Sequence, residues 1–527
     1  MSGIHLTLKV FAFIQARTGS TRFAGKVLKS FTKSPDWCIL DHIIFRLEKV
    51  LPKENIILLI PKNDSPLKEY ADKNRINYFE GDENDVRSRF IEASKKFNPE
   101  WILRLTADNP FLDLEHLELL IESTFTTTAD LLSFAGLPLG ATGEIFKREA
   151  LINFPEEKLE NRHREHVSLH IKEFTDYYTV IKLKNLIPPQ FHSIIPNIRI
   201  TIDESDDMEL CNSIFENLKN NPTFGVKEII DLYQINKDLF LKNINVNQVT
   251  FTIPKFDFIK EKKILIIYGN KEEFGTGHYE RMKFLYVYLQ SISYPCEIRS
   301  NLEEIPDNFD LYILDSRDIE IPGDLKNKKW LLVDHYGKDN NYINFYSLPH
   351  PSLKIKKINE NFLAPFILNT FAPGDQKENY VLVYAGNLKE KETHKLDQMV
   401  FNLFPNQNIY RIGGYDKSNL KNVKIMQRLT RFEFYIKLNF CNAFINYFGQ
   451  SIMEALILKK AIYIYSISDY HTELAKYLEK YTDINFLGNV FEENFVADFT
   501  YDKKLENEEN FSNLGFSKLI KLVDEIN

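Results

Sequence analysis

The sequence has few cysteines and no long apolar run, and each absence excludes a class of protein. Its four cysteines, Cys38, Cys211, Cys296 and Cys441, lie far apart in 527 residues, without the paired spacing of a zinc site or a disulfide framework. No apolar stretch approaches the roughly 18 residues that span a bilayer, and no secretory signal pattern begins the chain. We therefore expect a soluble, cytoplasmic protein without a membrane span.

An excess of basic residues is also absent. The formal net charge is −8, and Lys and Arg are spread along the chain. This argues against broad nucleic-acid binding but is compatible with a local basic pocket for nucleotide phosphates. The hydrophobic content of 44% supports full cores. At about 100 to 200 residues per domain, the length predicts about two to four units.

The most informative stretch lies near the N-terminus, where an apolar run over residues 8–16 predicts a buried strand. The loop that follows combines glycines, hydroxyls and cations: Arg17, Gly19, Ser20, Thr21, Arg22, Gly25 and Lys26. Glycines allow close backbone approach, and several cations can follow several phosphate oxygens, so the loop suits a triphosphate. A basic surface turn after an edge strand is the alternative.

Strand and helix patterns then alternate. We expect helices over residues 41–51, 85–93 and 114–123. Strands are expected over residues 55–60 and 101–106, and another short strand ends at residues 78–79. This rhythm predicts a mostly parallel sheet covered by helices on both faces. In such a sheet, ligands collect at the carboxyl ends of the strands.

Two aspartates follow predicted strands of this half. Asp108 comes after residues 101–106, and Asp203 closes the strand-like stretch 198–203. Both are candidate ligands of Mg²⁺, which is usually held by one or two carboxylates together with substrate phosphates. Alternatively, Asp108 serves as a helix cap or turn residue. Among the acids after Asp203, some are candidates for capping a helix predicted over residues 208–218.

Together these stretches resemble the spore-coat polysaccharide cytidylyltransferase family, relatives of the CMP-Kdo and CMP-acylneuraminate synthetases. FIQARTGSTRFAGKVL is similar to the family's QARxGSxRLPGKVL, with Phe23-Ala24 in place of Leu-Pro. FEGDENDVRSRF, RLTADNPFLD, LPLGATGEIF, REHV and IRITIDESDD also match family segments, with Ala107 where the family often has Gly. The resemblance covers about residues 8–220 and implies a Rossmann-like, GT-A-like nucleotidyltransferase domain.

The resemblance also implies an activity: Mg²⁺-dependent transfer of CMP from CTP to a sugar acceptor, with release of pyrophosphate. Family motifs then assign roles to residues. Arg17, Arg22 and Lys26 offset the triphosphate charge, Gly19 and Ser20 bind the nucleotide, Asp108 and Asp203 hold the metal, and Arg104, Glu144, Glu165 and His166 bind the acceptor. His166 could equally be a hydrogen-bonded core histidine. The family further implies a homodimer.

The pattern breaks between residues 237 and 263, a stretch of Asn and Lys with one Pro and no helical period. We therefore predict a domain over 1–240, a linker over 241–261 and a second domain over 262–527. The second domain begins with a strand over 262–270, then the loop containing Gly275, Gly277 and His278, and a helix. Further strands are expected over 310–314, 329–333, 380–385, 408–412, 443–447 and 461–467. They predict two Rossmann-like halves, about 262–375 and 376–527, dividing near residues 371–377.

GTGHYER and the later FGQSIMEAL resemble the UDP-sugar hydrolase of pseudaminic acid biosynthesis, a relative of MurG-type GT-B glycosyltransferases whose motifs are GxGHxxR and GGSxxxEAL. This resemblance, over about residues 262–490, implies a GT-B-like domain that hydrolyses a UDP-linked amino sugar. His278 would be the base, and Gly275, Gly277, Ser451 and Glu454 would bind the nucleotide. Arg281 would support the loop and bind substrate. Asp334, which falls where the family has acidic residues at a strand end, would also bind substrate, with His335 and Tyr336 beside it lining the cleft.

The second domain departs from its family at several positions. Gln450 replaces a glycine, YAGN stands for GGSD, and DYHTELA stands for NQxxxA. Glycines before a helix also often serve only tight packing. Three hypotheses follow: a bifunctional nucleotide-sugar enzyme of nonulosonate-type surface glycan synthesis, a cytidylyltransferase fused to a glycosyltransferase, or one fused to a catalytically silent binding or oligomerisation module.

Overall fold

The computed structural model describes residues 8–19, 22–243, 246, 258–269, 276–300, 305–316, 320–336, 342–351, 361–371, 378–426, 429–493, 495 and 512–526. The chain divides into two compact units. The N-terminal domain comprises Leu8–Ile259 with Gln290–Ser293, and the C-terminal domain comprises Lys260–Leu289 and Tyr294–Asn527. Residue 260 falls within the stretch 241–261 that the sequence predicts as a linker. Among the described residues, no helix is both long and apolar enough to cross a membrane.

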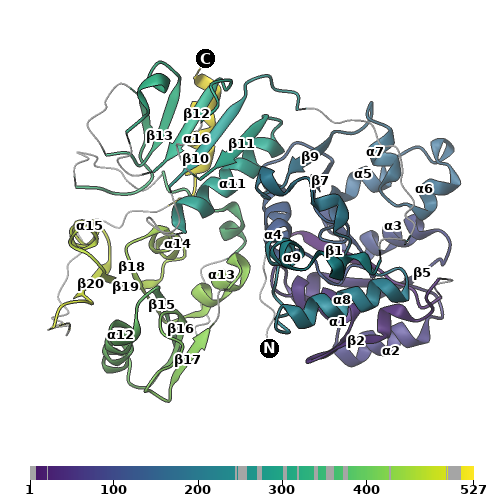
Figure 1. The fold of residues 1–527 in the computed structure, drawn as a ribbon, viewed down its shortest axis with the longest axis horizontal. Coiled ribbons are helices and arrows are strands. Elements are labelled where there is room, and N and C mark those ends of the chain that lie inside the picture. The colour runs from purple at the N-terminus through teal and green to yellow at the C-terminus, as the bar shows by residue number, and fades with distance from the viewer. Residues whose placement is uncertain are drawn as a thin grey trace. The chain divides into compact units, whose positions relative to one another are not determined.

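The N-terminal domain is built on a seven-stranded sheet in the order β5-β4-β1-β6-β8-β7-β9 (Figure 1). Its pairs are parallel except that β8 runs antiparallel to both of its neighbours. The strands are β1 (Val10–Gln15), β4 (Ile56–Pro61), β5 (Asn77–Gly81), β6 (Trp101–Thr106), β7 (Leu131–Ala135), β8 (Glu144–Lys147) and β9 (Val180–Lys184). The sheet is therefore mostly parallel, as the alternating strand and helix patterns predict.

Helices cover both faces of this sheet, because every residue of β4 is buried although its side chains alternate between the faces. On one face, Phe90 and Ala93 of α3 pack with Phe13 of β1 and Ile102 of β6 in one core cluster. The helices are α1 (Ile39–Leu47), α2 (Ser65–Asn74), α3 (Val86–Phe97), α4 (Leu114–Ser123), α5 (Arg148–Ile152), α6 (Asn161–Glu165), α7 (Leu169–Glu173), α8 (Ser205–Asn217) and α9 (Val226–Ile235). A two-stranded hairpin joins β2 (Ser30–Lys33) and β3 (Asp36–Cys38).

The register of the central strands determines where the loops lie. β1 and β6 pair in parallel from Val10 opposite Trp101 to Gln15 opposite Thr106. Both strands therefore end at the same level of the sheet. The loops that leave them, one glycine-rich and basic and the other containing Asp108, begin side by side at the carboxyl edge.

The C-terminal domain contains two sheets, and all pairs between their described strands are parallel (Figure 1). The first has the order β11-β10-β12-β13-β14 and the second the order β17-β16-β15-β18-β19-β20, both of which are doubly wound arrangements. The first uses β10 (Ile264–Tyr268), β11 (Cys296–Arg299), β12 (Leu311–Asp315), β13 (Trp330–Val333) and β14 (Ile343–Phe345). The second uses β15 (Tyr380–Gly386), β16 (Asn408–Gly413), β17 (Val423–Met426), β18 (Ala443–Tyr447), β19 (Ala461–Ser466) and β20 (Ile484–Asn489). The predicted α/β class with Rossmann-like parallel sheets is confirmed.

The last helix of the chain returns to the first of these two sheets. Phe516 of α16 packs on Phe284 of α11, with ring centroids 4.6 Å apart, and Lys262, just before β10, donates to the carbonyl of Val523 at 2.7 Å. α16 therefore belongs to the lobe built on the first of these two sheets, at the start of the C-terminal domain. The helices are α11 (Gly277–Ser291), α12 (Glu390–Leu403), α13 (Arg431–Phe440), α14 (Gln450–Ile457), α15 (Asp469–Glu479) and α16 (Gly515–Glu525).

One predicted strand of the N-terminal domain is not a regular strand. Residues 198–203 make a single isolated bridge, between Arg199 and Leu139. The amides of Ile200 and Ile202 instead donate to the carbonyls of Leu139 and Asp108, at 2.9 and 2.8 Å. The segment thus bonds to two different loops. It therefore forms no continuous ladder of hydrogen bonds with one neighbouring strand. The predicted division near residues 371–377 falls largely on residues 372–377, outside the described residues.

Candidate active site

The loop after β1 is closed by two sets of bonds. The amide and hydroxyl of Thr18 donate to the carboxylate of Asp64 at 2.8 and 3.0 Å, and Asp64 also caps α2. At the other end, the amide of Gly25 donates to the carbonyl of Thr18 at 3.0 Å. Gly25 has φ +67°, a left-handed conformation that favours glycine. Gly19, predicted to bind nucleotide, is exposed in this loop, and Ser20 lies outside the described residues.

Two of the three predicted loop cations lie against Asp203. Lys26 is buried at the start of the short helix η1 (Lys26–Leu28), and its Nζ donates to the carbonyl of Ile202 and lies 3.3 Å from Oδ1 of Asp203. Nη2 of Arg22 lies 3.4 Å from the same oxygen. Arg17 is exposed, and its charge adds to burial in lowering the pKa of Arg89. The loop thus carries positive charge to the second predicted aspartate.

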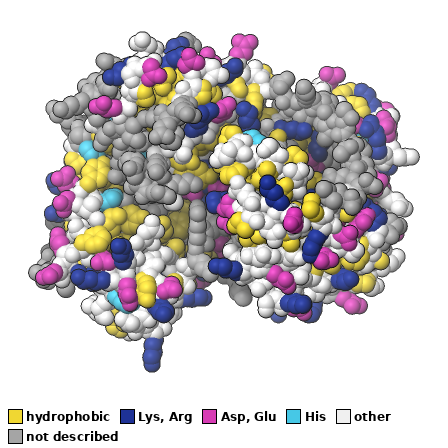
Figure 2. All heavy atoms as spheres, viewed as in Figure 1, with side chains coloured by type: hydrophobic (Ala, Val, Ile, Leu, Met, Phe, Trp, Pro, Cys, Tyr) yellow, Lys and Arg dark blue, Asp and Glu magenta, His cyan; other side chains and the backbone are white. Residues whose placement is uncertain are grey.

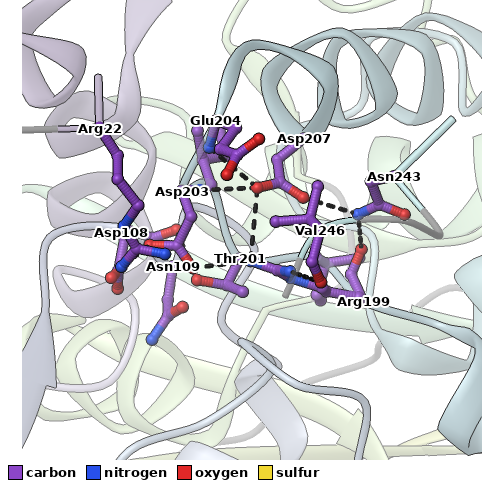
Figure 3. Close-up of polar contacts among 12 residues, drawn as sticks. Arg22, Asp108, Asn109, Arg199, Thr201, Asp203, Glu204, Asp207, Asn243 and Val246 are labelled. Atoms are coloured by element: carbon purple, nitrogen blue, oxygen red, sulfur yellow. Dashed lines mark hydrogen bonds and ion pairs between the residues drawn. The ribbon is translucent and has the colours of Figure 1, made fainter. Parts of the chain in front are cut away.

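Asp108 lies beside Asp203 at the carboxyl edge (Figure 3). Its Oδ1 accepts a hydrogen bond from Thr106 at 2.5 Å, and Asn109 donates to that same threonine hydroxyl at 3.0 Å. Burial raises the pKa of Asp108, the charge of Lys26 opposes this, and the charge of Asp203 raises it further. The two carboxylates therefore repel each other.

Close backbone packing allows the segment with Asp203 to lie along this edge. Gly140, from the family segment LPLGATGEIF, has φ +97°, and a Cβ there would lie 2.8 Å from the amide nitrogen of Thr201. It would also lie 3.1 Å from Oδ1 of Asn109. Only glycine satisfies both the conformation and the space.

The aspartate pair fits a divalent cation. Within the described part of the chain, no group of three or more His, Cys, Asp and Glu side chains is arranged to hold a metal ion. Two carboxylates completed by phosphate oxygens and water are the usual donor set for Mg²⁺. The mutual repulsion of Asp108 and Asp203 is the electrostatic condition that a cation relieves.

Three further residues, to which the motifs assigned no specific role, form a network next to Asp203. Nη2 of Arg199 donates to Oδ2 of Asp203 at 2.6 Å. Asp207, considered only as a helix cap, accepts the amides of Asp203 and Glu204 at 2.8 and 3.0 Å. Asn243 donates to Asp207 at 2.8 Å. Arg199 and Asp207 belong to the motif IRITIDESDD, which could have drawn attention to them.

Two of the predicted acceptor residues, Arg104 and Glu144, form an ion pair. Arg104 pairs with Glu144 at 3.0 Å, and Lys172 and Ser168 bond to the same carboxylate. Burial opposes ionisation, but the charges of Lys172 and Arg104 lower the pKa of Glu144 to about 2. Glu165 is exposed. His166 is half-buried, and burial lowers its pKa.

In the C-terminal domain, His278 and Arg281 of α11 share one buried carboxylate. Nδ1 of His278 lies 2.6 Å from Oδ1 of Asp315, and two nitrogens of Arg281 donate to Asp315 at 2.5 Å each. Burial opposes ionisation of Asp315, but Arg281 and His278 lower its pKa. The sequence prediction missed Asp315, although it directly follows a predicted strand. Gly277 is exposed at the start of α11, and Gly275 lies outside the described residues.

Asp334 is tied to the same arginine. Nη1 of Arg281 donates to Oδ2 of Asp334 at 2.6 Å, while Oδ1 accepts the amides of Ser347 and Leu348 at 2.7 and 3.0 Å. Asp334 has φ +50°, and this strained conformation is held by those bonds. Arg281 and Asp334 thus bond to protein groups, and their predicted contact with substrate stays a prediction.

Ser451 and Glu454 lie on α14, in the lobe of the C-terminal domain that is built on its second sheet. Asn446 donates to the hydroxyl of Ser451 at 2.5 Å, and the hydroxyl of Tyr435 donates to Glu454 at 3.0 Å. Burial raises the pKa of Glu454 to about 7. Of the predicted nucleotide contacts, Ser451 and Glu454 therefore lie apart in sequence and sheet from Gly277, which begins the helix that contains His278.

Comparison with known proteins identifies the N-terminal domain as a nucleotidyltransferase. Residues 11–248 match the family described as cytidylyltransferase. The spore coat polysaccharide biosynthesis protein SpsF of Bacillus subtilis (strain 168) is 30% identical over 236 residues, which are 44% of this chain and 95% of that protein. An uncharacterized protein of Methanocaldococcus jannaschii is 33% identical over 242 residues, 46% of this chain and 96% of that protein. The chain belongs to the cytidylyltransferase family, as the N-terminal motifs predict.

One solved structure matches a similar share of this chain. The cytidylyltransferase from Leptospira borgpetersenii is 26% identical, with a TM-score of 0.41, and the match covers 46% of this chain and all of that one. The family match ends at residue 248, before the C-terminal domain. The resemblance of the C-terminal domain to a UDP-sugar hydrolase stays a prediction.

Proposed function

We propose that the N-terminal domain transfers CMP from CTP to a hydroxyl of a sugar, with Mg²⁺, in the synthesis of a surface polysaccharide. The observation that carries the proposal is the contact of Lys26 and Arg22 with Asp203 beside Asp108, at the carboxyl edge of a family-defined domain. The relative named for spore coat polysaccharide biosynthesis supports the product class. A nonulosonate or related sugar is the proposed acceptor, and a homodimer the proposed assembly.

The sugar oxygen attacks the α-phosphate of CTP, the bond from that phosphorus to the bridging oxygen breaks, and pyrophosphate leaves. Arg17, Arg22 and Lys26 bind and orient the triphosphate, and their charges stabilise the negative charge that develops on its oxygens. Asp108 and Asp203 would hold Mg²⁺, whose chemistry here is to neutralise phosphate oxygens. The attacking hydroxyl loses its proton to solvent, and we propose no side chain as its base.

The acceptor is proposed to bind near Arg104 and His166. Arg104 is anchored by Glu144, and its charge contributes to lowering the pKa of His166. An arginine held in this way suits a carboxylate or hydroxyl of a sugar acid. Glu165 precedes His166 in the sequence and is exposed, so its carboxylate can accept hydrogen bonds from sugar hydroxyls.

The test is pyrophosphate release by the full chain with CTP, Mg²⁺ and a panel of nonulosonates and related sugars. We expect release that requires both CTP and an acceptor and that is lost in Asp108→Ala. UTP, ATP and GTP serve as controls for nucleotide choice. Absence of CTP binding and turnover across a broad panel would overturn the proposal.

For the C-terminal domain, we propose hydrolysis of a UDP-linked amino sugar. The observation that favours it is the contact between Nδ1 of His278 and Oδ1 of Asp315 at 2.6 Å, because a carboxylate partner orients an imidazole for proton transfer. Water would lose its proton to the imidazole and attack the anomeric carbon, and UDP would leave. Together with the first activity, this makes the chain a bifunctional nucleotide-sugar enzyme.

Release of UDP from a panel of UDP-amino sugars tests this second activity, with His278→Asn as the control. Release that occurs only with an added acceptor would favour a glycosyltransferase. Absence of both reactions, with the N-terminal activity intact, would favour a silent binding or oligomerisation module.

A further inference from the structure

The two carboxylate oxygens of Asp203 have different partners (Figure 3). Oδ1 lies 3.4 Å from Arg22 and 3.3 Å from Lys26, both on the loop that we propose for triphosphate binding. Oδ2 accepts a hydrogen bond from Arg199 at 2.6 Å. One oxygen therefore faces two cations at longer range, while the other is held by a short, charge-assisted bond.

Arg199 is well placed to hold a carboxylate in one orientation. The residue is only 7% exposed and lies four positions before Asp203 on the same extended segment. Its Nη1 donates to the carbonyl of Val246 at 3.2 Å, and its Nη2 also lies 3.4 Å from Asp207. The guanidinium is thus fixed by groups other than Asp203, and its plane determines where Oδ2 can lie.

Asp207 and Asn243 in turn fix the backbone around Arg199. Asp207 is fully buried, and its Oδ2 accepts the amide of Asp203 while its Oδ1 accepts from Asn243. Asn243 also donates to the carbonyl of Arg199 at 3.3 Å. Asn243 and Val246 come from a stretch that the sequence predicts as linker, and they complete this network from within the N-terminal domain.

We propose that Arg199 is a positioning residue for Asp203: by holding Oδ2 it leaves Oδ1 as the oxygen that faces the metal, on the side of Arg22 and Lys26. The inference rests on the proposed metal role of Asp203. Mg²⁺ demands near-ideal ligand geometry, and groups that orient a ligating carboxylate commonly change metal affinity about 10–100-fold when they are replaced. A purely structural arginine would change stability without changing the affinity for metal.

The test is a titration of the full chain with Mn²⁺, in which free Mn²⁺ is measured by its electron paramagnetic resonance signal. Wild-type protein and Asp203→Asn are compared first, because loss of binding in Asp203→Asn establishes the metal site independently of Arg199. Arg199→Lys keeps the charge but removes the planar fork, and we expect its Kd for Mn²⁺ to rise about 10–100-fold. The Mg²⁺ concentration for half-maximal pyrophosphate release should rise in parallel, with kcat largely recovered at saturating Mg²⁺.

Arg87→Lys is the matched control. Arg87 is 2% exposed in the same domain, and it pairs with Glu156 at 2.7 Å and with the carbonyl of Leu151 at 2.6 Å. This variant loses a buried arginine of the same kind and should keep the wild-type Kd for Mn²⁺. If Arg199→Lys does not fold, Asn243→Ala tests the same network, and a several-fold weaker binding of Mn²⁺ is expected.

The outcomes separate the two claims. Wild-type affinity for Mn²⁺ in folded Arg199→Lys, with binding lost in Asp203→Asn, would overturn the role of Arg199 and leave the proposed metal site intact. Wild-type affinity in a folded Asn243→Ala would overturn it in the same way when Arg199→Lys is not obtained. Binding unaffected by Asp203→Asn would overturn the metal site and the inference together.

Discussion

Lys26 and Asp203 lie 177 positions apart in the sequence, yet Nζ of one is 3.3 Å from Oδ1 of the other. This contact joins the glycine-containing loop after β1 to the segment that follows the acceptor region. Because Asp108 stands beside Asp203, the contact brings a basic loop and two carboxylates to one edge of the sheet. The loop that we propose binds phosphates and the aspartates that we propose hold the metal therefore lie in one place.

Replacement of Lys26 is predicted to impair catalysis more than folding. Lys26→Met removes a charge that we propose stabilises the reacting phosphates, and loss of one such donor typically costs about 10² to 10³ in kcat. Steady-state pyrophosphate release measures the effect. Lys29→Met, three positions along and exposed, is the control and should retain activity. A Lys26→Met enzyme with wild-type kcat and KM would contradict the assignment.

Gly140→Ala is predicted to destabilise the N-terminal domain. A Cβ at φ +97° is strained by about 1–3 kcal/mol, and contact with the amide of Thr201 at 2.8 Å adds to this. Thermal unfolding should therefore begin at a lower temperature than in wild type. Gly323→Ala is the matched control, since a Cβ there meets nothing within 4 Å and no positive φ is involved. Equal stability of the two variants would show that the close approach at Gly140 is not needed.

Stability is predicted to depend on pH through Glu144. Because Lys172 and Arg104 overcome burial and lower its pKa from 4.5 to about 2, the ionised form stabilises the folded state above pH 4.5. That contribution, on the order of 2–3 kcal/mol, should be lost as the pH falls from 4.5 toward 2. Denaturant unfolding of wild type and Glu144→Gln at pH 7, 4 and 3 measures it. The difference between the two proteins should shrink at the lower pH values, and a constant difference would be inconsistent with this ion pair.

In the C-terminal domain, Asp315→Asn is predicted to slow UDP release. The carboxylate contacts Nδ1 of His278 at 2.6 Å and orients the ring that we propose is the general base, and loss of general-base catalysis costs about 10² to 10⁴ in rate. A UDP-release assay with the pH profile of kcat/KM gives the readout. His394→Asn on α12 is a control that should keep the wild-type profile. An unchanged profile in Asp315→Asn would argue against a base held in this way.

The sequence predicts the parts of the site that follow regular elements. The strand before Asp108 was predicted at its observed bounds, Trp101–Thr106, because it is a short apolar run that ends at polar residues. Asp203 was predicted to close a strand, but its segment is held by carbonyls of two separate loops instead of a ladder. Asp203 lies beside Asp108 in the structure. The role of the two aspartates as metal ligands came from the motif resemblance and stays a prediction.

The surrounding network could not be read in this way. Asn243 meets Arg199 across 44 positions and Asp315 meets His278 across 37, and no local period records either contact. Glu144 was predicted as an acceptor residue, but Lys172 and Ser168, which bond to its carboxylate, lie in short helical segments without a distinctive pattern. Such contacts depend on how separate elements pack, and one sequence does not encode that packing in its spacing.

The most direct measurement of the central claim is phosphorus NMR of CTP incubated with Mg²⁺, a sugar panel and the full chain. The account predicts loss of the three CTP signals with matched growth of one phosphodiester signal and pyrophosphate, and no change with Asp108→Asn or Asp203→Asn. Unchanged CTP with every acceptor, or equal turnover in the two aspartate variants, would contradict the account.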